Sequence, residues 1–344
     1  MSNAPLISYA QRFEDLYLMR CFGARSEGFY IDIGSGHPVH DNASFAFYLK
    51  GWRGITVEPN PWLARLTSAV RRRDRHLEAL IGAVTGMARF HLVNEFHGLS
   101  TMIEDHARSA LSEFGKTSQA ITVPVMTLRE LCQQQHAPSV FDFLKVDVEG
   151  VERDVLLNGD WRNYRPKVVV VEALAPYTLA PAWPEWEPFL ARHGYRYVWF
   201  DSLNRYYLAE EARELACCLE AAPTSFPDVL QFRDLKPALA DAAHPDHRLA
   251  KLLAGADMTR LPLADHEMLL QRLTADLPAT LLETRADAAA VAEAIERLLG
   301  PDTSLSHSDL ALPAAAGLRD VYAALVDSDQ FRAACGRISA SYAW

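Results

Sequence analysis

The most informative segment of the chain is FYIDIGSGHP, residues 29–38. It starts with an apolar run typical of a buried strand, which carries Asp32 near its end and leads directly into a turn with Gly34 and Gly36. Because glycine has no Cβ, such a turn can adopt positive-φ conformations and lets a ligand approach the backbone closely. The segment therefore predicts a strand and turn of a nucleotide-binding α/β domain.

The chain continues as an alternation of short apolar strands and helical stretches up to about residue 208. This alternation is typical of a parallel sheet covered by helices on both faces. The predicted strands are residues 28–33, 54–57, 76–79, 88–92, 141–146 and 167–171. YRYVWF and RYYLA follow, separated by the turn 201–204, and their alternating aromatic and polar residues predict an antiparallel hairpin. We expect an α/β fold with a Rossmann-like, mostly parallel sheet and a terminal hairpin, as in class I methyltransferases.

The last third of the chain has a different character. Residues 221–247 contain four prolines among mixed polar residues, which indicates an irregular connector. The following segment is rich in Ala and Leu, with apolar stripes at helical spacing and no clustered polar side chains. We predict a catalytic domain over residues 1–235 and an α-helical accessory domain over residues 246–344. The stripes are typical of a core or of a subunit contact, so a homo-oligomer formed through these helices stays an open alternative.

Composition excludes several classes of protein. The net charge of -10 argues against nucleic-acid binding, which needs clustered Lys and Arg to neutralise phosphates. No apolar stretch approaches the ~20 residues of a membrane span, and the N-terminus lacks the pattern of a signal peptide. The cysteines, which we expect to be reduced and structural, form no CxxC pair and are Cys21, Cys132, Cys217, Cys218 and Cys335. We expect a cytoplasmic protein.

The next predicted strand, in GITVEPN, ends in an acidic residue, Glu58. A carboxylate at this position can accept hydrogen bonds from both hydroxyls of an adenosine ribose. The third glycine of a dinucleotide-binding turn is absent, because Val39 stands there after Pro38. S-adenosylmethionine carries an adenosine but no phosphate, so these residues favour it over NAD. A nicotinamide-dependent oxidoreductase is the alternative that Val39 and the hairpin disfavour.

Two further strands end in carboxylates. FDFLKVDVEG presents Asp147 and Glu149, and KVVVVEA presents Glu172. In open α/β sheets ligands bind beyond the carboxyl ends of the strands, so we expect these acids near the crevice formed by the glycine turn. Glu149 could instead interact with a helix dipole, and Glu172 could be a surface strand end.

Taken together, the motifs resemble those of the FkbM-type methyltransferases, a family that includes enzymes that methylate sugars. The resemblance covers about residues 6–235 and rests on motifs that occur in this order along the chain: SYAQRFEDLYL (8–18), GFYIDIGSGHPVHDNAS (28–44), FYLKGWRGITVEPNP (47–61), GLSTM (98–102), ITVPVMTLREL (121–131), FDFLKVDVEGVERDVL (141–156), RPKVVVVEA (165–173) and, after the hairpin, SFPDVLQF (225–232).

This resemblance implies a class I methyltransferase fold, S-adenosylmethionine as methyl donor and transfer to oxygen. We expect the acceptor to be a hydroxyl of a small molecule, either a sugar or glycan or a secondary metabolite. The alternative from another class is a catalytically inactive, methyltransferase-like module that binds a glycan or a protein partner. The presence of Asp147 together with the cofactor acids counts against that alternative.

The resemblance also implies roles for single residues. Asp32, Gly34 and Gly36 fall on the family's first cofactor motif, and Glu58 falls on its ribose acid. The family's N-terminal motif, which we expect to fold over the cofactor, is represented by Ser8, Gln11, Glu14 and Asp15. The candidate cofactor-binding residues are Gln11, Asp32, Gly34, Ser35, Gly36, Glu58, Asn60 and Ser100.

Transfer of a methyl group to an alcohol requires that the hydroxyl lose its proton. We predict that Asp147 activates the hydroxyl, either as a general base or as the ligand of a divalent cation. In the second case Mg²⁺ or Mn²⁺ would be held with Glu149 or Glu172. A further alternative is that His37 takes the proton. The candidate catalytic residues are therefore Asp147, Glu149 and His37, and the candidate metal ligands are Asp147, Glu149 and Glu172.

Aromatic residues follow the strand that ends in Glu172. Tyr177, Trp183 and Trp186 could offer flat apolar faces to a sugar ring. Packing in a core or a lid explains them equally well.

Overall fold

The computed structural model describes residues 6–93, 118–175, 178–223, 225–301, 303, 305–313 and 315–342. The chain forms two compact units. One, which we call the sheet unit, comprises Ser8–Thr67 and Arg73–Pro227. The other, the helical unit, comprises Met1–Ile7, Ser68–Arg72 and Asp228–Trp344.

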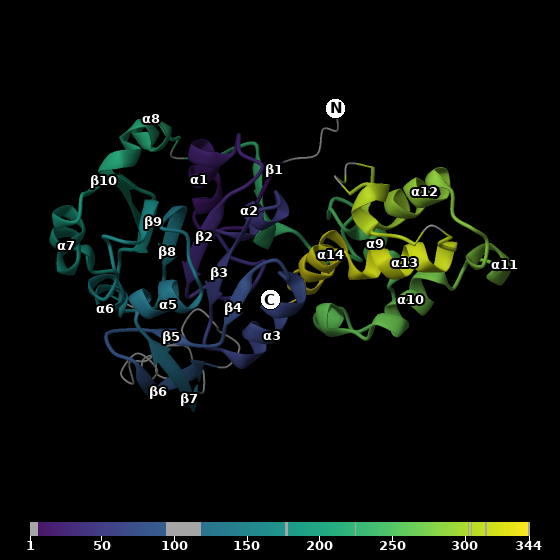
Figure 1. Ribbon diagram of the computed structural model, residues 1–344, viewed down its shortest axis with the longest axis horizontal. Coiled ribbons are helices and arrows are strands. Elements are labelled where there is room, and N and C mark those ends of the chain that lie inside the picture. The colour runs from purple at the N-terminus through teal and green to yellow at the C-terminus, as the bar shows by residue number, and fades with distance from the viewer. Residues whose placement is uncertain are drawn as a thin grey trace. The chain divides into compact units, whose positions relative to one another are not determined.

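The sheet unit is built on a seven-stranded sheet with the strand order β10-β11-β9-β8-β2-β3-β4 (Figure 1). Its strands are β2 (Phe29–Ile33), β3 (Arg53–Val57), β4 (Arg75–Leu77), β8 (Val140–Val146), β9 (Arg165–Glu172), β10 (Tyr195–Phe200) and β11 (Asn204–Ala209). The five strands from β4 to β9 pair in parallel, whereas β11 pairs antiparallel with both β9 and β10. The prediction of a mostly parallel sheet that ends in an antiparallel hairpin is confirmed.

Both faces of this sheet are buried, because successive side chains of a strand point to opposite faces. On one face Ile31, Leu144 and Val169 belong to a core that α5, α6 and α7 cover. On the other face Tyr30 and Phe143 pack against α1, α2 and α8. Its described helices are α1 (Glu14–Phe22), α2 (Phe45–Leu49), α3 (Pro61–Val70, of which the residues up to Thr67 belong to this unit), α5 (Leu128–Gln134), α6 (Glu152–Leu157), α7 (Glu187–Arg192) and α8 (Ala216–Glu220). The segments η2 (Trp183–Glu185) and η3 (Glu210–Leu215) are 3₁₀ turns. Burial on both faces explains why β9 reads as a continuous run of valines.

A second, three-stranded sheet in the same unit has the order β5-β7-β6. It contains β5 (Leu80–Ile81), β6 (Gly86–Val93) and β7 (Ser118–Met126), and β6 pairs antiparallel with β7. The strand predicted at residues 88–92 is therefore present, but it lies outside the central sheet. Alternating hydrophobicity indicates a strand without indicating its partner, so the sequence did not separate the two sheets.

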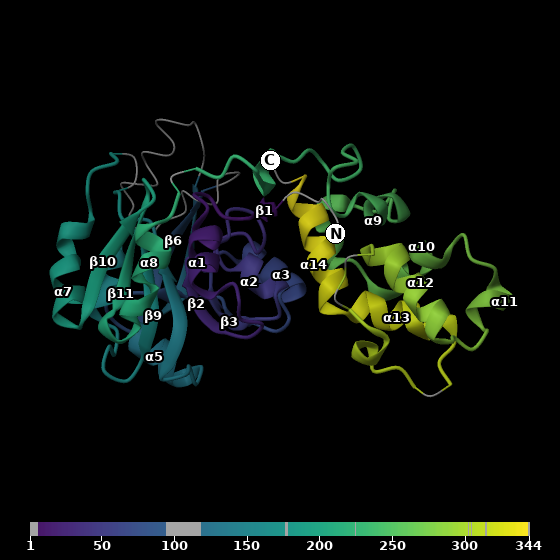
Figure 2. The same cartoon turned by 90° about the horizontal axis from the view of Figure 1, so that it is seen from above.

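The helical unit contains Leu6 and Ile7 of β1 (Leu6–Ser8) and its partner strand β12 (Val229–Gln231). Helices follow (Figure 2). These are α9 (His247–Leu252), α10 (His266–Thr274), α11 (Ala279–Leu282), α12 (Ala288–Leu299), α13 (Leu318–Asp327) and α14 (Asp329–Ala340), with 3₁₀ turns η4 (Phe232–Asp234), η5 (Met258–Leu263) and η6 (His307–Leu310). The predicted helical extension is thus confirmed. Its apolar stripes, with Val291 of α12 and Val321 of α13 among them, form the unit's own core. Among the described residues, no helix has the length and apolar character that a membrane crossing requires.

Candidate functional site

The turn after β2 brings two strand ends together. Gly34 and Gly36 both have positive φ, 74° and 58°, a conformation that glycine adopts without strain. A Cβ at residue 34 would lie 1.6 Å from the carbonyl oxygen of Asp147, so the turn passes directly over the chain that leaves β8. At Gly36, by contrast, no atom of the described residues other than Gly36 and its two chain neighbours lies within 4 Å of where a Cβ would be. The turn is therefore packed tightly on one side and open beside Gly36.

Glu58, which follows β3, lies beside this turn. Its side chain is buried, with 7% of the residue exposed. Oε2 accepts a hydrogen bond from the Gly36 amide at 3.0 Å, and Oε1 accepts one from the Asn60 amide at 2.8 Å. The pKa of Glu58 is raised to about 7: burial is the largest cause, the two amides oppose it, and the charges of Asp147 and Asp32 add to it. A carboxylate has about four acceptor positions, so Glu58 keeps two for further donors.

The other candidate cofactor residues lie in different surroundings. Ser35 is buried, and its Oγ has no hydrogen-bond partner within the described part of the chain. Asp32 is also buried, inside β2, and accepts a hydrogen bond from Ser44 Oγ at 2.6 Å. The side chain of Asn60 accepts the amide of Trp62 at 2.9 Å and so caps the start of α3. Ser100 lies outside the described residues.

These features fit S-adenosylmethionine. The buried Ser35 hydroxyl still needs a hydrogen-bond partner, and a polar ligand beside the turn can supply one. The space beside Gly36 admits a ligand close to the backbone, and Glu58 retains acceptor capacity for ribose hydroxyls.

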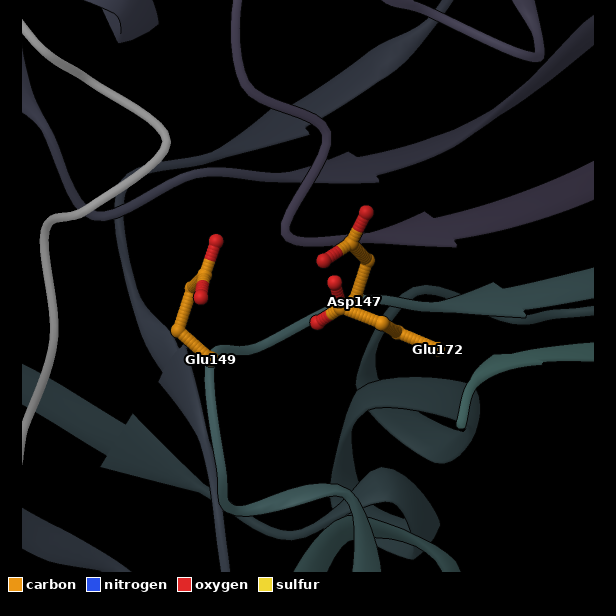
Figure 3. Close-up of side chains that lie close together, drawn as sticks. All are labelled: Asp147, Glu149 and Glu172. Carbon is orange, nitrogen blue, oxygen red and sulfur yellow. The ribbon is translucent and has the colours of Figure 1, made fainter. Parts of the chain in front are cut away.

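Three carboxylates meet at the ends of β8 and β9. Asp147, Glu149 and Glu172 each offer an oxygen, and these oxygens lie within 4.8 Å of one another (Figure 3). Burial, and then the charge of Asp147, raises the pKa of both glutamates well above the usual range. Glu172 Oε2 is buried without a hydrogen-bond partner among the described residues. The group therefore repels additional negative charge and would be stabilised by protons or a cation.

Lys145 is a residue of this site that the sequence reasoning missed. It lies on β8, opposite Asp32 of β2, and its side chain is only 6% exposed. Its Nζ donates to Asp147 Oδ2 at 2.6 Å. Burial alone lowers the pKa of a lysine, but the charges of Asp147, Asp32 and Glu14 outweigh it and raise the pKa of Lys145. A lysine inside a mostly apolar strand, two residues before a strand-end acid, was the available signal.

His37 lies in the loop after the glycine turn. Its Nδ1 accepts the backbone amides of Val39 at 3.2 Å and His40 at 3.1 Å. A neutral imidazole with Nδ1 as acceptor carries its proton on Nε2. In this arrangement His37 is suited to donate a hydrogen bond rather than to remove a proton.

The residues of the N-terminal motif have separate environments. Asp15 accepts hydrogen bonds from Ser8 Oγ at 2.6 Å and from the Tyr9 amide at 2.7 Å, so it organises its own segment. Glu14 accepts from Asn204 Nδ2 at 3.0 Å, across the start of β11. Burial, and then the charge of Asp201, raises the pKa of Glu14 to about 8. Gln11 lies in the loop before α1 and is partly exposed.

The aromatic residues after β9 are largely used in packing. Trp186 is buried in the core of the sheet unit. Trp183 stacks on the guanidinium of Arg205, with its ring centre 4.5 Å from Cζ. Tyr177 lies outside the described residues. Trp186 is thus a core residue, and Trp183 is the partly exposed aromatic of the pair.

Comparison with known proteins gives a family match and similar solved structures. Residues 32–197 match the family model described as the methyltransferase FkbM domain. The chain is similar to the crystal structure of methyltransferase FkbM from Methylobacillus flagellatus, with 14% identity and a TM-score of 0.35 over 56% of this chain and 47% of that one. It is also similar to a TehB-like SAM-dependent methyltransferase from Corynebacterium glutamicum, with 11% identity and a TM-score of 0.33 over 57% of this chain and 87% of the other. The chain thus spans about half the length of the first of these structures. No curated protein matches the sequence.

Proposed function

We propose, from the premise that residues 32–197 place this chain in the FkbM methyltransferase family, that it transfers a methyl group from S-adenosylmethionine to a hydroxyl oxygen. The observation that carries the proposal is the contact of three elements: the turn at Gly34 and Gly36, the buried Glu58 bonded to that turn, and the chain at Asp147 against which the turn packs. These elements bring the carboxylate of Glu58, which we assign to the ribose, and the strand end at Asp147 to the same turn.

The cofactor half of the proposal assigns Glu58 to the ribose hydroxyls. The free lone pairs of Glu58 accept those hydroxyls, while its bonds to the Gly36 and Asn60 amides hold the carboxylate in place. Ser35 Oγ and the backbone beside Gly36 contact the rest of the cofactor. When bound, the cofactor supplies an activated methyl group on a sulfonium. Asp32 supports the site from within β2.

The acceptor half assigns Asp147 to the hydroxyl. Methyl transfer is an in-line displacement, so the protein must align the oxygen and accept its proton. Lys145 holds Asp147 Oδ2 and thereby orients the carboxylate. Glu149 and Glu172 lie next to it, and burial raises the pKa of both. Either glutamate, when ionised, can therefore accept the proton that Asp147 has taken from the hydroxyl. His37 is the donor that can orient the acceptor oxygen.

An open branch of this proposal is a divalent cation. The oxygens of Asp147, Glu149 and Glu172 are of the kind that Mg²⁺ and Mn²⁺ prefer, and they lie close enough to share one ion. Such an ion would lower the pKa of a bound hydroxyl. The ammonium of Lys145 competes for Asp147 in this branch. Loss of activity in a chelator, with recovery in Mg²⁺ or Mn²⁺, supports the cation; full activity in the chelator rejects it.

The acceptor is proposed to be a hydroxyl of a sugar, a glycan or a secondary metabolite. The test is to incubate the chain with methyl-labelled S-adenosylmethionine and fractions of glycans and small molecules, and to identify the labelled product by mass spectrometry. A methylated hydroxyl supports the proposal. Label on nitrogen or carbon would contradict it, and tight cofactor binding with no product in any fraction would favour a non-catalytic binding module.

We further propose that the helical unit serves assembly or acceptor delivery, since it has a core of its own and the candidate cofactor residues lie in the sheet unit. A chain that ends at residue 240 should still bind S-adenosylhomocysteine, measured by calorimetry. A folded but non-binding truncated chain would make the helical unit part of the cofactor site.

A further inference from the structure

The segment before α1, residues 9–13, is hydrogen-bonded at both ends to the candidate site, and we call it the strap. At its start the carbonyl of Tyr9 accepts the amide of Asn42 at 2.8 Å. The side chain of Asn42 in turn donates from Nδ2 to the carbonyl of Ser35 at 2.8 Å, inside the glycine turn. The first end of the strap is therefore held by the loop that carries candidate cofactor residues.

Glu14, the first residue of α1, holds the second end of the strap. Its Oε2 accepts the amide of Arg12 at 2.6 Å, and its Oε1 accepts a hydrogen bond from Asn204 Nδ2 at 3.0 Å. Asn204 begins β11, where it pairs in register with Glu172, the carboxylate at the end of β9. Directly opposite residues of an antiparallel pair lie on the same face of a sheet. The strap thus runs from the glycine turn to the strand end at Glu172.

Asn204 joins two carboxylates from different parts of the chain. The residue is only 1% exposed, and its Nδ2 donates both to Glu14 and, at 3.2 Å, to Asp201 Oδ2. A side-chain amide nitrogen carries two hydrogens, so each carboxylate can take one. Asp201 is also held by the hydroxyl of Tyr206, which donates to Oδ2 at 2.8 Å. Without the hydrogens of Asn204, the carboxylates of Glu14 and Asp201 would lie close together with no donor between them.

The backbone of the strap is strained at its last residue. Phe13 adopts a left-handed conformation with a φ of 63°, which costs free energy for a residue with a Cβ. Its ring packs on that of Phe226, with the ring centres 5.2 Å apart. A strained residue keeps its conformation only where the surrounding contacts fix it. The hydrogen bond from Asn204 to Glu14, the next residue, is one of these contacts.

We propose that Asn204 is a positioning residue of the cofactor site: its amide holds Glu14, and through Glu14 it holds the strap between the glycine turn and the strand end at Glu172. The inference rests on the proposed function, because it takes the space beside the glycine turn as the place where S-adenosylmethionine binds. Asn204 touches no reacting atom in this scheme. When its hydrogen bonds are lost, the strap has to be ordered again on binding, and this ordering lowers the affinity for the cofactor.

The test exchanges donor and acceptor between Asn204 and Glu14 in the full chain. Asn204→Asp keeps the size of the side chain but puts a third carboxylate beside those of Glu14 and Asp201, so it should release the strap. We expect S-adenosylhomocysteine binding, measured by calorimetry, to weaken about tenfold, a typical coupling between residues in contact. Adding Glu14→Gln restores one donor and one acceptor to the pair and returns the wild-type net charge. The double variant should therefore bind within about threefold of the wild type.

Backbone hydrogen exchange, followed by mass spectrometry, reports on the strap directly. In Asn204→Asp the peptide with residues 9–13 should exchange faster, whereas α5 should exchange as in the wild type. Asn163→Asp is the matched control: Asn163 also donates from Nδ2 to an aspartate, Asp160, at 2.8 Å, but it is exposed and precedes β9 at its other end. This control should bind like the wild type. If Asn204→Asp does not fold, Asn204→Ala, which removes the donors without adding a charge, should loosen the strap and weaken binding in the same way.

The combination of affinity and exchange separates positioning from simple stabilisation. A purely structural role of Asn204 would lower the melting temperature and leave the affinity of the folded variant unchanged. The proposal is overturned if the variant loosens the strap but binds within about twofold of the wild type, or if exchange of the strap does not change. It is also overturned if the double variant binds no better than Asn204→Asp. A wild-type chain that does not bind S-adenosylhomocysteine would instead overturn the proposed function, and this inference with it.

Discussion

Replacing Glu58 by glutamine tests the proposed ribose contact with almost no change in side-chain volume. The wild-type carboxylate accepts the amides of Gly36 and Asn60, one on each oxygen. A glutamine has one oxygen and one NH₂, so one of these two amides faces a donor instead of an acceptor. The variant therefore loses the charge and part of the local support in one step.

The expected size of the effect follows from these contacts. Hydrogen bonds to a charged group are worth about 1.5–3 kcal/mol, and 1.4 kcal/mol corresponds to a factor of ten in affinity. We expect Glu58→Gln to weaken S-adenosylhomocysteine binding by about 10- to 150-fold.

The dependence on pH gives a second, independent readout. Burial raises the pKa of Glu58 to about 7 in the free protein. Ribose hydroxyls donate to the ionised form, so binding favours deprotonation and affinity falls as the pH drops below 7. The limit for one such group is about a tenfold loss of affinity between pH 8 and pH 6. Glu58→Gln has no charge to lose at this position, so its affinity should vary less over this range.

Isothermal titration calorimetry at pH 6, 7 and 8 measures both effects. Glu185→Gln, an exposed glutamate in the same unit, is the matched control and should bind like the wild type. If Glu58→Gln binds within threefold of the wild type at pH 8, or if its affinity falls with decreasing pH as steeply as that of the wild type, Glu58 does not hold the ribose.

Three further outcomes are expected. Asp147→Asn should lower turnover by about 100-fold, the usual scale for loss of a general base, and leave S-adenosylhomocysteine affinity nearly unchanged. Turnover within a few-fold of the wild type would remove Asp147 from the mechanism. Gly34→Ala should lower the melting temperature much more than Gly36→Ala does. Both glycines have positive φ, but only at residue 34 does a Cβ lie 1.6 Å from a carbonyl oxygen. Equal melting temperatures of the two variants would contradict the packing of the turn. Burial raises the pKa of Glu14 from 4.5 to about 8, so the folded state holds this proton more tightly than the unfolded state. The stabilisation from this bound proton, on the order of a few kcal/mol, is complete below pH 4.5 and is lost as the pH rises to 8. The melting temperature of Glu14→Gln should therefore depend less on pH over this window than that of the wild type.

Much of the central fold could be predicted from local patterns. Apolar runs such as that of β9 and the alternation in the hairpin indicate strands over a few residues, and the glycine turn after β2 identifies where the chain must bend sharply. The family resemblance added proposed roles for single residues, which local patterns cannot supply. The assignment of β6 to the central sheet failed, since strand pairing depends on partners elsewhere in the chain.

The candidate site was predictable only in part. The sequence indicates which carboxylates lie at strand ends, and parallel strands end at a common edge of the sheet. The structure accordingly brings oxygens of Asp147, Glu149 and Glu172 within 4.8 Å of one another. The chemistry of each side chain depends on what surrounds it. His37 illustrates this: its Nδ1 is occupied by backbone amides of its own loop, which no residue pattern reveals.

The sequence by itself determined the elements whose cause is local: the glycine turn, the buried strands, and the order of strands and helices that leads to a parallel sheet. Only the tertiary structure decided which distant groups meet. Lys145 pairs with Asp147 close to the charges of Asp32 and Glu14, and Glu14 of α1 accepts a hydrogen bond from Asn204 of β11. The physical reason is that hydrophobic periodicity fixes which face of an element is buried, whereas the partner of a buried charge is set by how those faces pack.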